Sequence, residues 1–440
     1  MKRRLFFLLS LFFFNTGFSE TVKDREGAVR ADAAKMEGNS RWIYNDIDAG
    51  FAEARRTDKP LMVVLRCVPC LACMGLDTEV LMGNAELEPL MDKFVRVRVI
   101  NANALDLSLF QFDYDLSFTA MFFDGDGKIY GRFGSWEHQK DSQNKATSGL
   151  RQAMERVSAL HENKVRFTDG FEGKKGDRMR FATPVDMPIL SDRYTDKLDW
   201  EGPVVKSCVH CHQIGDAIRD DLRADGDPLP LRWIFPYPAP ETVGLILAEE
   251  PVTGVEKVMP GSPADDAGFL PGDHLVSLES QPLISVADIS WVLHHAPDTG
   301  GLRAVVNRDG ESVELNLKLP LGWRLATDIS RRVGTWPMRR MAFGGMKLEV
   351  LTDEEKQKHG IEKGKLALHA VHVGQYGEHA AAKRNGFKKG DIIVELEGKD
   401  APLTESFLIA KNLTERKPGD TVSATVLRNG KRLELEIPIQ

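Results

Sequence analysis

The five cysteines carry the most reactive side chains of this 440-residue chain, and they fall into two groups. Cys67, Cys70 and Cys73 follow one another at intervals of three residues. Thiols at this spacing can form a disulfide, and a thiolate at a helix N-terminus is stabilised by the helix dipole. The first group therefore predicts a redox-active thiol site. A structural disulfide, Cys67–Cys70 or Cys70–Cys73, with a spare buried thiol is the alternative.

The second group contains Cys208, Cys211 and the adjacent His212. This CxxCH spacing is typical of covalent haem c attachment, where two thioethers hold the porphyrin and the histidine is the proximal iron ligand. A disulfide between the two cysteines, or a zinc site that uses His210 or His212, is the alternative. For a sixth iron ligand the chain offers only upstream candidates, namely His161, Met179 and Met187.

The residues on either side of the first cysteine group predict an α/β domain. Leu61 to Leu65 form a continuous apolar run, as expected for a strand buried on both faces, and a helix is expected to start near Cys70. Residues 95–99 alternate as a strand. Asp124 to Gly127 form a strong turn signal between two further short strands. Together these patterns predict a small mixed sheet flanked by helices over residues 40–164.

This segment resembles the thioredoxin-like fold of exported proteins, because a tryptophan, a helix, Lys59-Pro60, a strand and a CxxC motif follow in that order. The resemblance implies that Cys70 attacks, that Cys73 resolves and that Cys67 is an extra thiol. The chain departs from the pattern in two places. Pro69 stands where a tryptophan is usual before the first cysteine, and Phe118 stands where the cis-proline is usual.

The N-terminus predicts export. Lys2, Arg3 and Arg4 precede an apolar run to Phe14, so residues 1–19 are expected to be a signal peptide that is too short to span a bilayer. Its removal changes the net charge from −7 to −10 and leaves no general attraction for nucleic acid. We therefore expect a periplasmic or extracellular protein without a membrane span, in a compartment where disulfides persist.

The last 200 residues contain an internal repeat. Residues 264–273 match residues 382–391, and residues 307–310 match residues 427–430, at offsets of 118 and 120. Both copies resemble bacterial PDZ domains, which bind the C-terminus of a peptide by strand addition. The resemblance places the carboxylate-binding loops at eight residues: Val243, Gly244, Leu245, Ile246, Phe343, Gly344, Gly345 and Met346.

The fold class expected for the whole chain is multidomain α/β plus mainly-β. Its predicted parts are the signal peptide 1–19, a thioredoxin-like domain 40–164, an irregular CxxCH segment 165–237, PDZ-like domains 238–320 and 341–440, and a linker 321–340. This order resembles the exported thioredoxin-like/PDZ domain (seleno)protein family. One hypothesis is a redox protein that uses the dithiol and covalent haem c to exchange electrons with a thiol partner. The other is a non-enzymatic scaffold that binds protein C-termini. No protease motif is present in either case.

Overall fold

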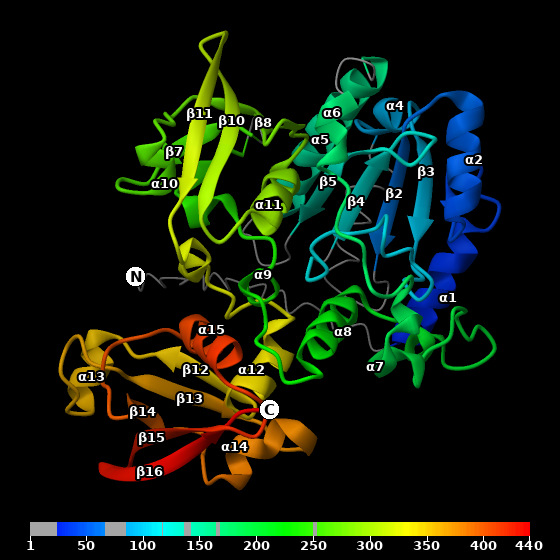
Figure 1. The fold of residues 1–440 in the computed structure, drawn as a ribbon. Coiled ribbons are helices and arrows are strands. Elements are labelled where there is room, and N and C mark those ends of the chain that lie inside the picture. Colours follow the sequence, from blue (N-terminus) through cyan, green and yellow to red (C-terminus); the bar gives the residue numbers. More distant parts are fainter. Residues whose placement is uncertain (1–23, 67–84, 117, 136–141, 164–167, 250–252) are drawn as a thin grey trace, which may run out of the picture.

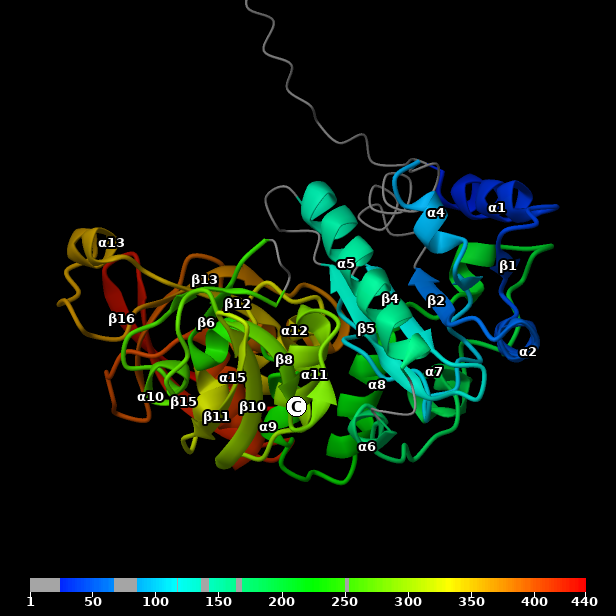
Figure 2. The same ribbon diagram turned by 90° about the horizontal axis from the view of Figure 1, so that it is seen from above.

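The computed structural model describes residues 24–66, 85–116, 118–135, 142–163, 168–249 and 253–440. An α/β domain comes first, short helices follow, and two β-rich domains complete the chain (Figure 1), which confirms the predicted fold class. Seen from above in Figure 2, the α/β domain lies at one end and both β-rich domains lie at the other.

The α/β domain is built on a five-stranded sheet with the order β1-β3-β2-β4-β5. Its strands are β1 (Ile43–Tyr44), β2 (Leu61–Arg66), β3 (Val95–Val99), β4 (Phe118–Phe123) and β5 (Ile129–Ser135). The first three are parallel to one another, and β4 and β5 are antiparallel to their neighbours. Every residue of β2 is buried, as the apolar run predicts for a central strand.

Helices cover both faces of this sheet. Helix α2 (Ile47–Thr57) lies on one face, and α4 (Glu88–Met91) and α5 (Ser142–Glu162) lie on the other. Helix α1 (Arg25–Met36) precedes the domain, and its Asp32 accepts a hydrogen bond from the Tyr44 hydroxyl at 3.1 Å. Through this contact α1 is tied to the edge of the sheet at β1.

Residues 168–243 consist mostly of short helical turns. They include α6 (Thr168–Glu172), α7 (Pro188–Ser191), α8 (Cys211–Arg223), α9 (Leu231–Ile234) and a 3₁₀ turn at Pro240–Val243. Helix α8 is the longest of these, and its Ile214, Ala217 and Ile218 are buried in the same core as β2 and β3. The CxxCH segment is therefore packed against the α/β domain.

The first β-rich domain comprises β6 (Leu245–Leu247), β7 (Val255–Val258), α10 (Pro263–Asp266), β8 (His274–Leu278), β9 (Gln281–Pro282), α11 (Val286–His295), β10 (Gly300–Arg308) and β11 (Glu311–Leu319). The linker follows, with a 3₁₀ turn at Trp323–Ala326 and helix α12 (Thr335–Phe343). The second β-rich domain comprises β12 (Met346–Val350), α13 (Asp353–Lys358), β13 (Leu368–Val373), α14 (Ala381–Arg384), β14 (Ile392–Leu396), α15 (Glu405–Glu415), β15 (Thr421–Arg428) and β16 (Lys431–Pro438).

The repeated sequence motifs form the same contact in both β-rich domains. Arg308 Nε lies 2.7 Å from Asp273 Oδ1 in the first copy, and Arg428 Nε lies 2.6 Å from Asp391 Oδ1 in the second. Each arginine ties the turn after a short helix to the hairpin near the end of its domain. The similarity between the two copies therefore reflects a shared structural ion pair.

Across the described ranges, no helix combines the length and the hydrophobicity needed to cross a bilayer.

Candidate functional site

Cys208 and Cys211 lie at the ends of the central strands of the α/β sheet. The small space beside them, about 10 Å³, is also lined by Leu65, Arg66, Val99, Ile100, Ala102 and Val209. Buried Asn103 fixes this turn, because its side chain donates to the Ser207 carbonyl at 2.8 Å and accepts from the Val209 N–H at 2.7 Å. The second cysteine group therefore lies beside Arg66, the residue that precedes Cys67 in the sequence.

The two cysteines of this pair differ in their surroundings. Cys208 has a free thiol, is 6% exposed, and donates from Sγ to the Ile100 carbonyl at 3.4 Å. Burial raises the pKa of its thiol to about 11, so that it is protonated and unreactive at neutral pH. Cys211 is half-buried and is the first residue of α8, where the helix dipole favours a thiolate. Cys211 is therefore the better placed of the two for thiol chemistry.

Haem c does not fit this arrangement of the CxxCH residues. Attachment requires both thiols to reach the edge of a porphyrin, whereas Cys208 points into the end of the sheet. The space beside the pair, about 10 Å³, is far below the roughly 300 Å³ of a small ligand pocket. Covalent haem stays a prediction from the motif, and no step proposed below depends on it.

The two histidines of the motif lie at the start of α8. His212 has a side chain that is 39% exposed, and its Nδ1 lies 3.6 Å from Asp216 Oδ2. Burial, His212 and Arg25 lower the pKa of His210 to about 4, so that its ring is neutral at pH 7. In the described part of the chain, no group of three or more His, Cys, Asp and Glu side chains is arranged to hold a metal ion.

Cys67, Cys70 and Cys73 lie outside the described residues, as does the predicted helix that starts near Cys70. The strand that leads to them ends in buried Arg66, which lies 3.3 Å from Asp32 Oδ1, and buried Arg98 is also ion-paired with Asp32. The end of β2 therefore carries two buried guanidinium groups that share one carboxylate.

Phe118, which stands at the usual cis-proline position, is the first residue of β4. It pairs in register with Arg66 of β2, and its buried ring packs edge-on against Phe133 with 6.2 Å between the centroids. A large aromatic side chain therefore stands at the position where the related fold has a proline.

The first β-rich domain is fixed to the α/β domain through helix α11. Lys174 Nζ lies 2.9 Å from Asp288 Oδ2, and both side chains are almost completely buried. The Arg132 N–H donates to Asp288 Oδ1 at 3.1 Å, and the Ser285 hydroxyl donates to the Arg132 carbonyl. The Arg132 guanidinium also lies over the Trp291 ring, 3.4 Å from its centroid. Edge strand β5 and helix α11 therefore form one packed unit.

The predicted carboxylate loop of the first copy, Val243–Ile246, joins a 3₁₀ turn to β6. Gly244 has φ +89°, and a Cβ at this position would lie 2.0 Å from Ser262 Oγ, so the turn requires glycine. Strand β6 pairs with β7 on one side, and among the described residues no strand pairs with its other side. This edge is open to an added peptide strand.

The corresponding loop of the second copy, Phe343–Met346, also follows a helical element that ends in a glycine cap. The N–H groups of Gly344 and Gly345 donate to the carbonyls of Arg340 and Arg339, both at 3.0 Å, and thereby end helix α12. The Gly244 N–H of the first copy likewise donates within the chain, to the Glu241 carbonyl at 3.0 Å, so these hydrogen bonds do not distinguish the two loops.

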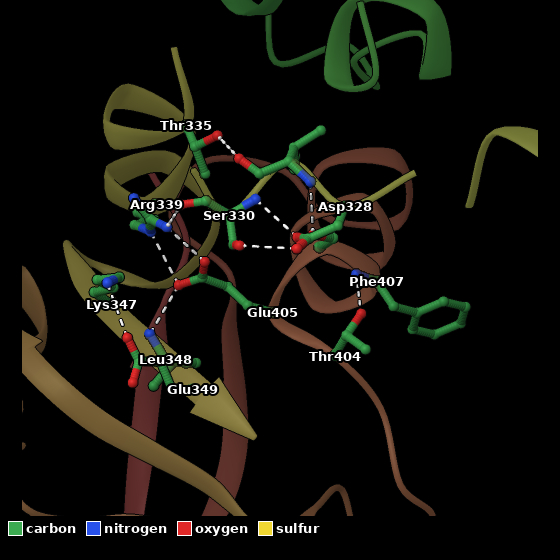
Figure 3. Close-up of polar contacts among 12 residues, drawn as sticks. Asp328, Ser330, Thr335, Arg339, Lys347, Leu348, Glu349, Thr404, Glu405 and Phe407 are labelled. Carbon is green, nitrogen blue, oxygen red and sulfur yellow. Dashed lines mark hydrogen bonds and ion pairs between the residues drawn. The ribbon is translucent and has the colours of Figure 1, made fainter. Parts of the chain in front are cut away.

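A buried ion pair lies between β12 and α15 of the second copy (Figure 3). Glu405 Oε1 accepts a hydrogen bond from the Leu348 N–H at 2.8 Å, and Arg339 donates to both oxygens of Glu405, at 2.9 and 2.6 Å. Leu348 belongs to β12, whose outer edge a bound peptide would occupy. The Glu405 carboxylate therefore accepts the hydrogen bond that the Leu348 N–H would otherwise donate to an added peptide strand.

The linker packs against the same helix. The Ile329 N–H donates to the Ser406 hydroxyl at 3.1 Å, which in turn donates to Asp328 Oδ1 at 3.1 Å. Ile329 is fully buried in the core of the second β-rich domain, together with Met338 of α12. The two tryptophans of this linker predict that it packs between the copies, but residues 321–340 carry no strong periodic pattern from which the individual contacts could be predicted.

Comparisons with known proteins identify the domains. Residues 42–125 match the Thioredoxin-like family, and residues 254–299 and 347–439 match the PDZ domain in two of its forms. Over 178 residues the chain is 27% identical to the "Probable periplasmic serine endoprotease DegP-like" of Pseudomonas savastanoi pv. phaseolicola, covering 40% of this chain and 35% of the relative. The protein of the same name from Ectopseudomonas mendocina is 28% identical over 182 residues, covering 40% of this chain and 36% of the relative.

The chain thus spans about a third of the length of the curated relatives it matches. Among solved structures, the "HtrA-type protease AlgWS227A with decapeptide" aligns with a TM-score of 0.22 at 20% identity, covering 32% of this chain and 40% of that one. From these domain matches and the fold, we conclude that the chain joins a thioredoxin-like domain to two PDZ domains.

Proposed function

We propose that the protein is an exported adaptor that binds the C-terminal segment of another protein in the groove of its first PDZ domain. The observation that carries this proposal is the outer edge of β6, which has no strand partner among the described residues and follows a glycine turn at Gly244. Strand addition at such an edge supplies backbone hydrogen bonds to a peptide of varied sequence. The leader-like residues 1–19 and the word "periplasmic" in the names of the relatives support an exported location.

The first PDZ domain is the better candidate because the second uses its own groove. The Glu405 carboxylate accepts a hydrogen bond from the Leu348 N–H, which strand addition would otherwise use. We therefore assign the second domain a structural role, in which it supports the linker.

A C-terminal peptide library displayed against the full chain tests this function. We expect selected peptides to lose at least tenfold in affinity on Ile246→Glu, because the new side chain places a negative charge in the loop that is predicted to bind the carboxylate of the peptide. Val276→Glu, at a residue of β8 that is 49% exposed, is the matched control and should leave binding unchanged. A library without binders, or binders that tolerate Ile246→Glu in a folded protein, would refute the proposal.

Thiol–disulfide exchange is a second candidate function. The specific observation in its favour is that Cys208 and Cys211 share their surroundings with Leu65 and Arg66, which lead into the first cysteine group. In this reaction the Cys70 thiolate attacks a partner disulfide, forms a mixed disulfide and releases one partner thiolate. The Cys73 thiolate then releases the second, so that two electrons pass to the partner and a Cys70–Cys73 disulfide remains. Both released thiolates take up protons from solvent.

Insulin reduction with dithiothreitol as the reductant tests this second function. We expect activity that is lost on Cys70→Ser and retained on Cys208→Ala, since the Cys208 thiol is buried and protonated. Equal activity of wild type and Cys70→Ser would contradict the redox proposal and leave the adaptor function in place. A visible spectrum of protein matured in a host with haem-attachment machinery tests the haem prediction separately.

A further inference from the structure

A cavity of about 820 Å³ lies where the thioredoxin-like domain, the first PDZ domain and the linker meet. The thioredoxin-like domain contributes Thr119 from β4 and Arg132 from β5, and the linker contributes Ala326. Ligand pockets of proteins have volumes of about 300 to 1,000 Å³, so this cavity has room for a short peptide segment.

The cavity continues the groove of the first PDZ domain. Its wall includes Leu247 and Ala248 at the end of β6, and Val286 and Ser290 in the first turns of α11. We consider a peptide that pairs antiparallel to β6 with its carboxylate at Val243–Ile246. Its residues further from the C-terminus then lie beside Leu247. The last few residues of the peptide therefore lie in the groove, and the residues that precede them enter the cavity.

Two polar atoms on the thioredoxin-like side of the cavity lack hydrogen-bond partners. Thr119 Oγ1 and Arg132 Nη1 are buried and unpaired, in residues that are 3% and 2% exposed. Proteins hydrogen-bond nearly all buried polar groups, and both residues line the cavity, so these two atoms leave hydrogen-bonding capacity unused beside it. The other nitrogens of Arg132 donate to the carbonyls of Gln111 and Lys174, at 2.6 and 2.8 Å, and hold the guanidinium in place.

We infer that this cavity binds the residues that precede the C-terminus of a peptide held in the first PDZ domain. This inference rests on the proposed adaptor function. Arginine only donates hydrogen bonds, so Arg132 requires an oxygen acceptor, which a backbone carbonyl or an acidic or amide side chain supplies. The Thr119 hydroxyl forms a second hydrogen bond to the same segment. The ligand is therefore an extended polypeptide that contacts both domains.

This arrangement brings the bound polypeptide close to the end of β2. Thr119 of β4 pairs in register with Leu65 of β2, which precedes Cys67 by two residues in the sequence. A partner protein recognised through its C-terminus is thereby presented to the thioredoxin-like domain.

Two peptides test the inference on the full chain: the tightest ten-residue C-terminal peptide from the library, and its last four residues alone. Binding is measured by fluorescence anisotropy. We expect the longer peptide to bind at least tenfold more tightly. Thr119→Val keeps the shape of the side chain and removes one hydrogen bond, so the longer peptide should lose about three- to tenfold in affinity. The four-residue peptide should bind as before.

Two linker variants form a matched pair. Ala326→Trp places a large ring in the cavity wall and should remove most of the advantage of the longer peptide. Leu321→Trp, at a residue that is 83% exposed and outside the cavity, should leave that advantage unchanged. Equal affinity of the two peptides would overturn the inference, as would a higher affinity of the longer peptide that survives both Thr119→Val and Ala326→Trp. In either case, the effect of Ile246→Glu on affinity still tests peptide binding in the groove separately. Absence of binding by either peptide overturns the proposed function as well.

Discussion

Glu405 accepts a hydrogen bond from the backbone N–H of Leu348, at 2.8 Å, across the groove of the second PDZ domain. Glu405 begins helix α15 and Leu348 lies in the middle of β12, so the contact joins the two elements between which a peptide would lie. The Arg339 guanidinium holds the carboxylate in this position. The groove that resembles a peptide site in sequence is thus closed by the chain itself.

Loss of this carboxylate should destabilise the second PDZ domain. In Glu405→Ala, the Arg339 charge is left buried without its partner, a change that costs about 3 to 5 kcal/mol in other proteins. We expect a lower melting temperature and faster hydrogen exchange of the Leu348 amide. Glu349→Ala is the control, since Glu349 is an exposed partner of Lys347 and contributes less than about 1 kcal/mol. Equal melting temperatures of both variants would contradict the assignment.

The contact between the domains should depend on Lys174. In Lys174→Ala, Asp288 keeps its backbone hydrogen bonds but loses the ion pair, so the first PDZ domain should separate from β5. We expect faster limited proteolysis between the domains and a loss of the length advantage of long peptides. Exposed Lys175→Ala should behave as wild type. Proteolysis of Lys174→Ala at the wild-type rate would show that the ion pair does not hold the domains together.

The two cysteines of the CxxCH segment should react at different rates. Because burial raises the pKa of the Cys208 thiol to about 11, iodoacetamide at pH 8 should modify Cys208 at least tenfold more slowly than the half-buried Cys211. Peptide mapping by mass spectrometry measures both rates in one sample. In urea the rates should become similar, and similar rates in the native protein would contradict the buried position of Cys208.

Acid should destabilise the protein through its buried histidines. Burial lowers the pKa of His295 to about 4, so below about pH 6.5 the unfolded chain binds a proton there that the folded chain does not bind. Stability therefore falls as the pH decreases, and His295 alone accounts for about 2 kcal/mol at pH 5. The melting temperature should drop between pH 7.5 and pH 5, and less so in His295→Gln. Exposed His274→Gln should show the full drop, and a drop of equal size in both variants would exclude His295 as its source.

The sequence contained enough information to predict most of the fold. The apolar run at Leu61 to Leu65 predicts the central strand, and the Asp124–Gly127 turn predicts the β4–β5 hairpin. The repeat was detectable in the sequence because both copies keep the residues of one ion pair, in which Arg308 and Arg428 are the equivalent arginines. Helix α1 was not predicted, since it buries only Val29 and Met36 and so has little hydrophobic periodicity.

The candidate sites were less predictable, because they depend on contacts between distant segments. Cys208 lies beside Arg66, more than a hundred residues earlier, and no local pattern records this proximity. In the sequence, Glu405 is an acidic residue in the first turn of a helix, which is common. Its contact with the Leu348 N–H is evident only in the structure. Motif spacing indicates which side chains can react, whereas the packing around them decides which ones do.

The attachment of helix α11 to strand β5 has a consequence for partner selection. A PDZ domain on a flexible linker samples many positions relative to a neighbouring domain. Ligand residues at many different distances from the C-terminus can then contact that neighbouring domain. Here the groove is held at one position by Lys174, Asp288 and Arg132. On the adaptor function proposed above, a partner would therefore bring a given residue to the thioredoxin-like domain only when a fixed number of residues separates it from the carboxylate. Such a protein would select partners by the number of residues in the tail that precedes the carboxylate, independently of most of that tail's sequence.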